Sequence, residues 1–195
     1  MNDEPSAATR KPRRSDATRA LILSAARERF AAEGYDRATI RAIADDAGVD
    51  PALVMRYYGN KAGLLAAAAD PDLRMLSIPT LPRGAAGEAL VQHFLERWED
   101  DDILQALLRT ATTNDSAAER MRLVFAKQIA PMVARLSGDE KNASYRAGLV
   151  ASQIMGFALC RYILRLPPVI AMRRPEIIKS LGPTIERYLF GTRPV

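Results

Sequence analysis

The spacing of apolar residues limits what this chain can fold into more than any other feature of its sequence. Apolar side chains recur three and four positions apart along nearly the whole chain, which is the spacing of one face of an α-helix. Residues that favour helix N-caps precede several of these segments, and glycines follow them. No convincing strand alternation is found. The sequence therefore predicts an all-α fold.

The expected helices follow from these caps and breaks. Ser15 or Asp16 caps the first helix, which runs to about Glu33 and stops at Gly34. The remaining expected segments are 39–47, 50–58, one beginning at Lys61, and then about 85–99, 102–113, 116–136, 141–165 and 175–190. Prolines place a loop or kink at 70–83 and a break at Pro167 and Pro168, and Pro131 can bend or split the segment 116–136.

Composition excludes several classes of protein. The chain has 195 residues, one Cys (Cys160) and one His (His93), so a disulfide framework, a Cys-based zinc site and a two-His metal cluster are excluded. No nucleophile with a base, phosphate loop or paired carboxylates is evident, and we expect no enzyme, cofactor or metal site. No apolar run spans a membrane, and residues 1–15 are too polar for a secretory signal. We expect a cytoplasmic protein without membrane contact.

The segment 39–58 carries the functional information. It comprises a capped helix, a tight turn and a second capped helix that begins with Pro51. Small Ala44, then Gly48 in the turn and aliphatic Val54 have the spacing of a helix-turn-helix, whose second helix enters a DNA major groove. Two short helices sharing a glycine turn would show the same pattern without binding DNA.

The surrounding residues make the pattern specific. The residues from Arg19 to Leu65 resemble the DNA-binding domain of the TetR family of bacterial transcriptional regulators. The resemblance rests on Ile22-Leu23, Ala25-Ala26, Phe30, Gly34-Tyr35, Thr39, Ile43-Ala44, Ala47-Gly48-Val49, Tyr57-Tyr58-Gly59-Asn60-Lys61 and Leu64-Leu65. It implies a helix-turn-helix DNA-binding domain at 15–61, after a basic arm at 1–14, and a helical effector-binding and dimerisation domain at 62–195.

Individual DNA contacts can be assigned on chemical grounds. Arg56 is the expected base reader, because arginine to guanine is the commonest specific contact, and Ala52 on the same face offers an apolar surface. Lys61 resembles the phosphate-binding lysine of the family. At the position of Met55 the family often has an aromatic residue, so this chain departs from the pattern there. The expected DNA-binding residues are Arg13, Arg14, Thr39, Arg41, Ala52, Arg56, Tyr57 and Lys61.

Two of these assignments have plain alternatives. The basic arm, with Arg10 and Lys11 beside Arg13 and Arg14, can enter the minor groove or serve as a solubilising tail. Arg41 can contact DNA or remain a solvated surface charge. Net charge decides little here, because the chain carries only +5 and residues 161–195 hold the largest local excess.

The later helices carry candidate pocket and interface residues. Aromatic, Met and Leu side chains can enclose an apolar small molecule, with His93 as a polar contact, although most such residues form ordinary core. The candidates are His93, Phe94, Trp98, Leu107, Met121, Phe125, Met155 and Phe157. The expected dimer interface, a smooth stripe on one helix and an apolar face on the last, comprises Gly148, Ser152, Gly156, Ile178, Leu181 and Ile185.

The favoured hypothesis is a homodimeric repressor on a near-palindromic double-stranded DNA operator, released by an unknown small apolar effector. A constitutive or architectural helical DNA-binding protein without an effector is the alternative, and an enzyme is a distant third.

Overall fold

The computed structural model describes residues 14–74, 83–99 and 101–192. All of the regular structure in these ranges is helical. The α-helices are α1 (Arg14–Arg37), α2 (Ile40–Asp46), α3 (Pro51–Tyr58), α4 (Lys61–Ala68), α5 (Ala86–Trp98), α6 (Asp102–Ala111), α7 (Asp115–Val124), α8 (Ala130–Ser137), α9 (Ala143–Ala158), α10 (Pro167–Ile170) and α11 (Arg174–Phe190). The all-α prediction is confirmed.

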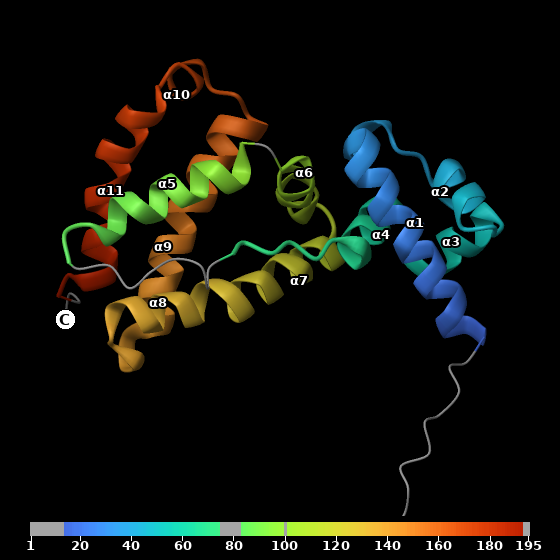
Figure 1. Cartoon of the computed structure of the whole chain (residues 1–195), viewed down its shortest axis with the longest axis horizontal. Helices are drawn as coiled ribbons and strands as arrows, with labels where there is room; N and C mark the ends of the chain where they lie inside the picture. Colours follow the sequence, from blue (N-terminus) through green and yellow to red (C-terminus); the bar gives the residue numbers. More distant parts are fainter. Residues whose placement is uncertain (1–13, 75–82, 100, 193–195) are drawn as a thin grey trace, which may run out of the picture.

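The helices form two groups that lie side by side (Figure 1). We call α1–α4 the head and α5–α11 the body of the molecule. The hydrophobic core of the head draws on all four of its helices and continues past Lys61 to Ala69, so it extends beyond the expected boundary at 61. The core of the body is built mainly from α5, α8, α9 and α11.

Local sequence explains where the head's helices begin and end. The side chains of Thr39, Asp50 and Asn60 accept hydrogen bonds from backbone N–H groups in the first turns of α2, α3 and α4. Gly34 has φ +75°, so the helical path of α1 breaks there although the assigned helix continues to Arg37. The caps predicted at Thr39, Asp50 and Asn60 and the break at Gly34 are confirmed. The predicted cap of the first helix is wrong, because α1 begins at Arg14 and includes both Ser15 and Asp16.

Proline has two different effects in the body. Pro131 lacks the N–H that would bond the carbonyl of Lys127, and the preceding turn widens into a π-helix, η2 (Phe125–Ile129). The expected helix 116–136 is therefore three consecutive segments. The predicted break at 167 and 168 is only partly right, because Pro167 and Pro168 open the one-turn helix α10. A second π-helix, η4 (Leu159–Ile163), extends α9.

Helices α5 and α11 cross at two glycines. A Cβ at Gly87 would lie 2.1 Å from the Gly182 carbonyl oxygen, and one at Gly182 would lie 2.5 Å from the side chain of Glu88. Glu186 of α11 also accepts hydrogen bonds from the backbone N–H of Gly84 (2.5 Å) and Gly87 (2.7 Å). A distant carboxylate thus satisfies the first turn of α5, for which Ala85 provides no side-chain cap.

We expect Gly87→Ala to destabilise the protein by about 1–3 kcal/mol, because the backbones of α5 and α11 must move apart to admit the methyl group. Gln92→Ala, at an exposed position of the same helix, is the control and should change stability by less than about 0.5 kcal/mol. Urea unfolding followed by circular dichroism measures both, and equal midpoints for the two variants would contradict the close crossing.

Candidate nucleic-acid interface and effector cavity

The turn between α2 and α3 fixes the orientation of these two helices. Gly48 has φ +65°, and the N–H of Val49 donates to the Ala44 carbonyl at 2.9 Å. Ala44 and Val54 are fully buried between the helices, as their spacing in the sequence predicts. The small side chain of Ala44 permits the close approach, and the opposite face of α3 remains open to solvent.

The exposed side chains of α2 and α3 include most of the expected DNA contacts. Ala52 and Arg56 are exposed on α3, and Arg41 is exposed on α2. Thr39 is also exposed, and its hydroxyl oxygen accepts from the N–H of Ala42 at 3.1 Å, which leaves the hydroxyl proton available to a phosphate. Within the described part of the chain, neither the Arg41 nor the Arg56 side chain forms an ion pair or a hydrogen bond.

Tyr57 and Lys61 are less exposed than these four residues. The Tyr57 ring packs against the head core, and the Arg56 guanidinium lies 5.5 Å from its centroid. The Lys61 ammonium donates to the Asp36 carbonyl at 3.1 Å and lies 4.5 Å from the centroid of the Tyr35 ring. Burial raises the pKa of Tyr35, with a further contribution from the Asp36 carboxylate.

The basic arm lies outside the described residues, and Arg13 with it. Arg14 begins α1, although its side chain is not described. Sequence reasoning missed Arg19 on the first turns of α1. Its guanidinium lies 4.9 Å from the centroid of the Tyr57 ring, on which Arg56 also packs. Nothing in the local sequence marked Arg19, because only the tertiary fold brings the start of α1 to the end of α3.

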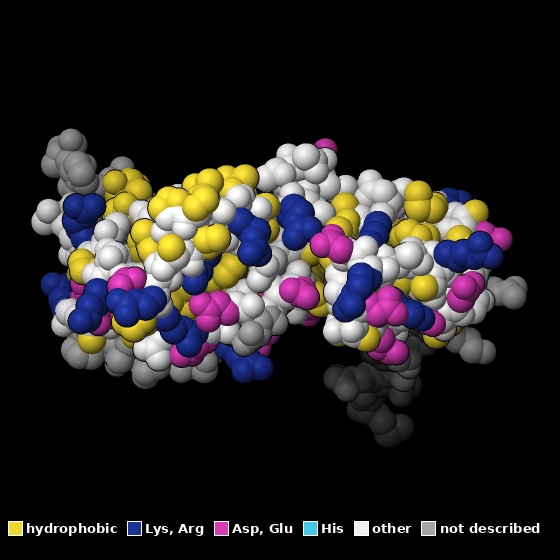
Figure 2. Space-filling model, turned by 90° about the horizontal axis from the view of Figure 1, so that it is seen from above, with side chains coloured by type: hydrophobic (Ala, Val, Ile, Leu, Met, Phe, Trp, Pro, Cys, Tyr) yellow, Lys and Arg dark blue, Asp and Glu magenta, His cyan; other side chains and the backbone are white. Residues whose placement is uncertain are grey.

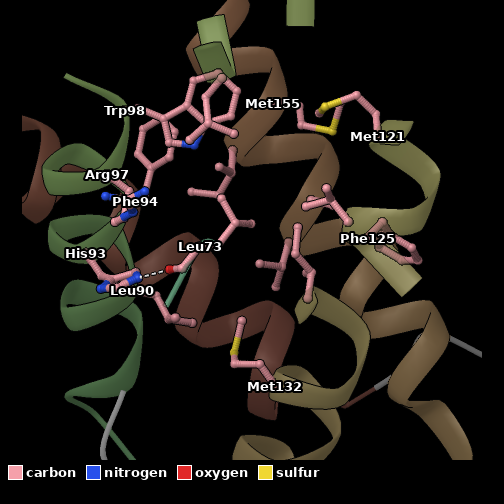
Figure 3. A pocket seen from close by; sticks show the side chains of 16 residues that line it. Leu73, Leu90, His93, Phe94, Arg97, Trp98, Met121, Phe125, Met132 and Met155 are labelled. Atoms are coloured by element: carbon pink, nitrogen blue, oxygen red, sulfur yellow. Dashed lines mark hydrogen bonds between the residues drawn. The ribbon is translucent and has the colours of Figure 1, made fainter. Parts of the chain in front are cut away.

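A small apolar cavity of about 60 Å³ lies in the body (Figure 3). Six of the eight residues expected at a pocket line it: His93, Phe94, Trp98, Met121, Phe125 and Met155. The lining that sequence reasoning missed comprises Leu73, Leu90, Arg97, Leu104, Val124, Ile129, Met132, Val150, Ala151 and Ile154.

Two expected lining residues lie elsewhere. Leu107 is fully buried with Ala66 and Ala117 in a separate cluster that joins α4, α6 and α7, so it packs between head and body. Phe157 lies behind the wall of the cavity, and its ring contacts that of Phe94 edge-on at 6.2 Å between centroids. Neither side chain lines the cavity.

Residues 69–74, which we call the connector, lead out of α4 and pass the cavity. Leu73 of the connector lines the cavity, and His93 Nε2 donates to its carbonyl at 2.7 Å, as drawn in Figure 3. Gln128 of η2 accepts from the Leu73 N–H at 2.8 Å and donates to the Pro71 carbonyl at 2.7 Å. His93 was expected as a ligand contact, and here it holds the connector.

Two arginines also hold the connector. Arg97 of α5 donates to the Asp72 carbonyl at 3.0 Å, and Arg120 of α7 pairs with the Asp70 carboxylate at 2.5 Å. Contacts from α5, α7 and η2 therefore fix residues 70–73, which follow the last helix of the head.

The expected interface residues divide into two groups. Gly148, Ser152 and Gly156 form an exposed stripe on α9, and a Cβ at either glycine would meet nothing within 4 Å. Ile178 and Leu181 of α11 are half-buried. The assignment of Ile185 to the interface is corrected, because its side chain is fully buried in the hydrophobic core of the chain itself.

The comparisons with known proteins identify the family. The family model for the tetR family of bacterial regulatory proteins matches residues 22–68, and the model for a tetracyclin repressor-like C-terminal domain matches residues 85–189. The chain belongs to the TetR family. It is a helix-turn-helix, DNA-binding transcriptional regulator, in a family whose members typically bind small-molecule effectors and act as dimers. The search of curated proteins found no match to this sequence.

Solved structures share the fold. A TetR transcriptional regulator from Rhodococcus sp. RHA1 has a TM-score of 0.60 at 17% identity, with 90% of this chain and 95% of that one covered. The TetR family repressor AlkX from Dietzia sp., implicated in the biodegradation of n-alkanes, has a TM-score of 0.56 at 18% identity, covering 88% and 94%. A TetR regulator from Haloarcula marismortui has 0.54 at 23%, covering 90% and 97%. Within the described residues, no helix is long and apolar enough to cross a membrane.

We expect Arg56→Ala to relax sequence preference at one base pair of the bound DNA by about 1–3 kcal/mol, because the exposed guanidinium is free to form a bidentate contact with guanine. The variant should keep the stability of the unaltered protein within about 0.5 kcal/mol, since the side chain is exposed. Selection from a library of randomised duplexes measures the preference. An unchanged preference at every position would show that Arg56 reads no base.

Proposed function

We propose that this chain forms a homodimeric repressor that binds a near-palindromic operator and is released from it by a small apolar effector. The observation that carries the proposal is that Leu73 of the connector lines the cavity while the connector leads directly out of α4. A ligand in the cavity and the orientation of the head are therefore linked through one short segment.

The size of the cavity supports this linkage. About 60 Å³ is well below the roughly 300–1,000 Å³ of pockets that enclose drug-sized ligands, so an effector must displace lining side chains to enter. Met121, Met132 and Met155 are flexible enough to repack. Leu73 must move as well if the ligand occupies its side of the cavity, and its backbone is part of the connector.

The lining defines the chemistry of the effector. Apart from His93 and Arg97, every side chain at the cavity is apolar, and three of them are aromatic: Phe94, Trp98 and Phe125. An apolar molecule of modest size fits this environment. By displacing Leu73, it would favour a connector position that differs from the one seen here, and the coupling equals its difference in affinity for the two states.

We propose the exposed stripe of α9 as the centre of the dimer contact. Gly148, Ser152 and Gly156 leave a smooth surface on which an identical helix can approach closely. Four exposed apolar side chains come after the stripe in the sequence. They are Leu164, Leu166, Ile170 and Met172, each at least 39% exposed. On the side of the molecule that carries α10, apolar side chains gather over the body (Figure 2). A second copy would cover such a surface.

The direct test of this function uses ligands first and DNA second. Thermal-shift screening of apolar compounds finds a ligand, and fluorescence anisotropy then measures the affinity for an operator selected from random duplexes with and without it. A repressor released by its effector binds the operator about 5–150-fold more weakly when the ligand saturates it. Operator affinity that no bound ligand changes would instead indicate a constitutive DNA-binding protein.

We expect Gln128→Ala to uncouple the two sites, because it removes two hydrogen bonds to the connector without removing a side chain from the cavity wall. Ligand affinity should stay within about twofold, whereas the effect of the ligand on operator affinity should fall several-fold. Gln105→Ala is the matched control, since Gln105 donates to the Trp98 carbonyl away from the connector. Equal coupling in both variants would contradict the proposal.

We expect Gly156→Arg to yield a folded monomer, because the side chain has open space within the subunit but would lie between the two copies of α9. Sedimentation should report the mass of one 21.4 kDa chain, whereas Ala126→Arg, an exposed small residue of η2, should keep the mass of two. Gly156→Arg that sediments as the unaltered protein does would place the dimer contact elsewhere.

A further inference from the structure

The start of α1 and the end of α3 meet at the ring of Tyr57. The guanidinium carbons of Arg19 and Arg56 lie 4.9 Å and 5.5 Å from the ring centroid, so two cations from two helices share one aromatic side chain. The hydroxyl of Tyr58 donates to the Arg19 carbonyl at 3.5 Å and adds a contact between the same helices. Both arginines are exposed to solvent.

The arginines at this ring differ from others in the head. Arg29 pairs with Glu33 and Asp46, both at 2.6 Å, which ties α1 to the end of α2. Within the described ranges, neither Arg19 nor Arg56 pairs with a carboxylate or donates a hydrogen bond to the protein. Two like charges therefore lie beside one ring, and their side-chain N–H groups have no acceptor in the part of the chain that the structure describes, an arrangement that an anion would stabilise.

We propose that Arg19 binds a phosphate of the DNA backbone next to the base that Arg56 reads, with the Tyr57 ring holding both guanidiniums in place. This inference rests on the proposed function, because it needs duplex DNA on the exposed face of α3. It extends the DNA-binding surface beyond the helix-turn-helix to the start of α1. The guanidinium of Arg19 has the planar, donor-rich geometry that suits a phosphate.

The proposal distinguishes the roles of the two arginines. A phosphate contact contributes equally to the affinity for every DNA sequence and makes that affinity depend on salt. A base contact changes the difference in affinity between sequences. Arg19 should therefore determine the salt dependence of binding, and Arg56 should determine its specificity. The Tyr57 ring, rather than its hydroxyl, has the positioning role, because both guanidiniums lie beside the ring.

Fluorescence anisotropy tests this with two duplexes of about 30 base pairs, one selected from a random library and one unselected, each titrated from about 0.05 to 0.2 M salt. For Arg19→Met, the slope of log affinity against log salt should fall by about 0.9 per subunit, and binding should weaken about tenfold on both duplexes alike. Arg37→Met, at the other end of α1, should leave the slope unchanged.

Tyr57 variants supply an independent readout. Tyr57→Phe, which keeps the ring, should retain the salt slope, whereas Tyr57→Ala should lower it as Arg19→Met does. A slope for Arg19→Met equal to that of the unaltered protein overturns the assignment of Arg19 alone. An unaltered protein that selects no duplex from the random library overturns the proposed function, and the role of Arg19 with it.

Discussion

Leu73 holds a position on which much of this structure depends. Its side chain closes the cavity of the body, while its backbone N–H and carbonyl bond Gln128 and His93. The connector is thereby fixed over the cavity between α4 and α5, although its sequence has no helical pattern of its own. Because α4 contributes to the core of the head, the proposed function makes the packing of this one leucine the link between the cavity and the orientation of α2 and α3.

The head and the body are also joined by direct side-chain contacts. Leu107, Ala66 and Ala117 form a small buried cluster that joins α6, α4 and α7. Arg109 of α6 pairs with Asp36 beside the kink of α1 at 3.1 Å, an exposed pair that contributes little energy. The apolar cluster therefore holds the two parts together more strongly than the ion pair does. In the proposed function, α4 therefore has two contacts with the rest of the chain through which a ligand in the cavity would act on the head: the connector and this cluster.

The sequence predicts the head well and the cavity less well, for a physical reason. The caps Thr39, Asp50 and Asn60 and the turn at Gly48 act within a few residues, so local sequence determines α2–α4. Ile129 and Met132 lie at helical spacing from Phe125, which was expected at the pocket, and could have been recognised with it as lining. Leu73 could not, because it lies in a proline-broken segment, and only distant partners place it at the cavity. For Ile185 the pattern indicates an apolar face without saying whether the subunit's own core or a second copy covers it.

The central claim is that the connector transmits occupancy of the cavity to the head, and amide hydrogen exchange measures this most directly. Exchange is followed in the unaltered protein with and without a saturating apolar ligand found by thermal shift. If the claim holds, the ligand changes the exchange rates of the Leu73 and Arg74 amides and of the α4 amides together with those of the cavity helices. A ligand that alters exchange in α5, α7 and α9 while the connector and α4 exchange as before would contradict it.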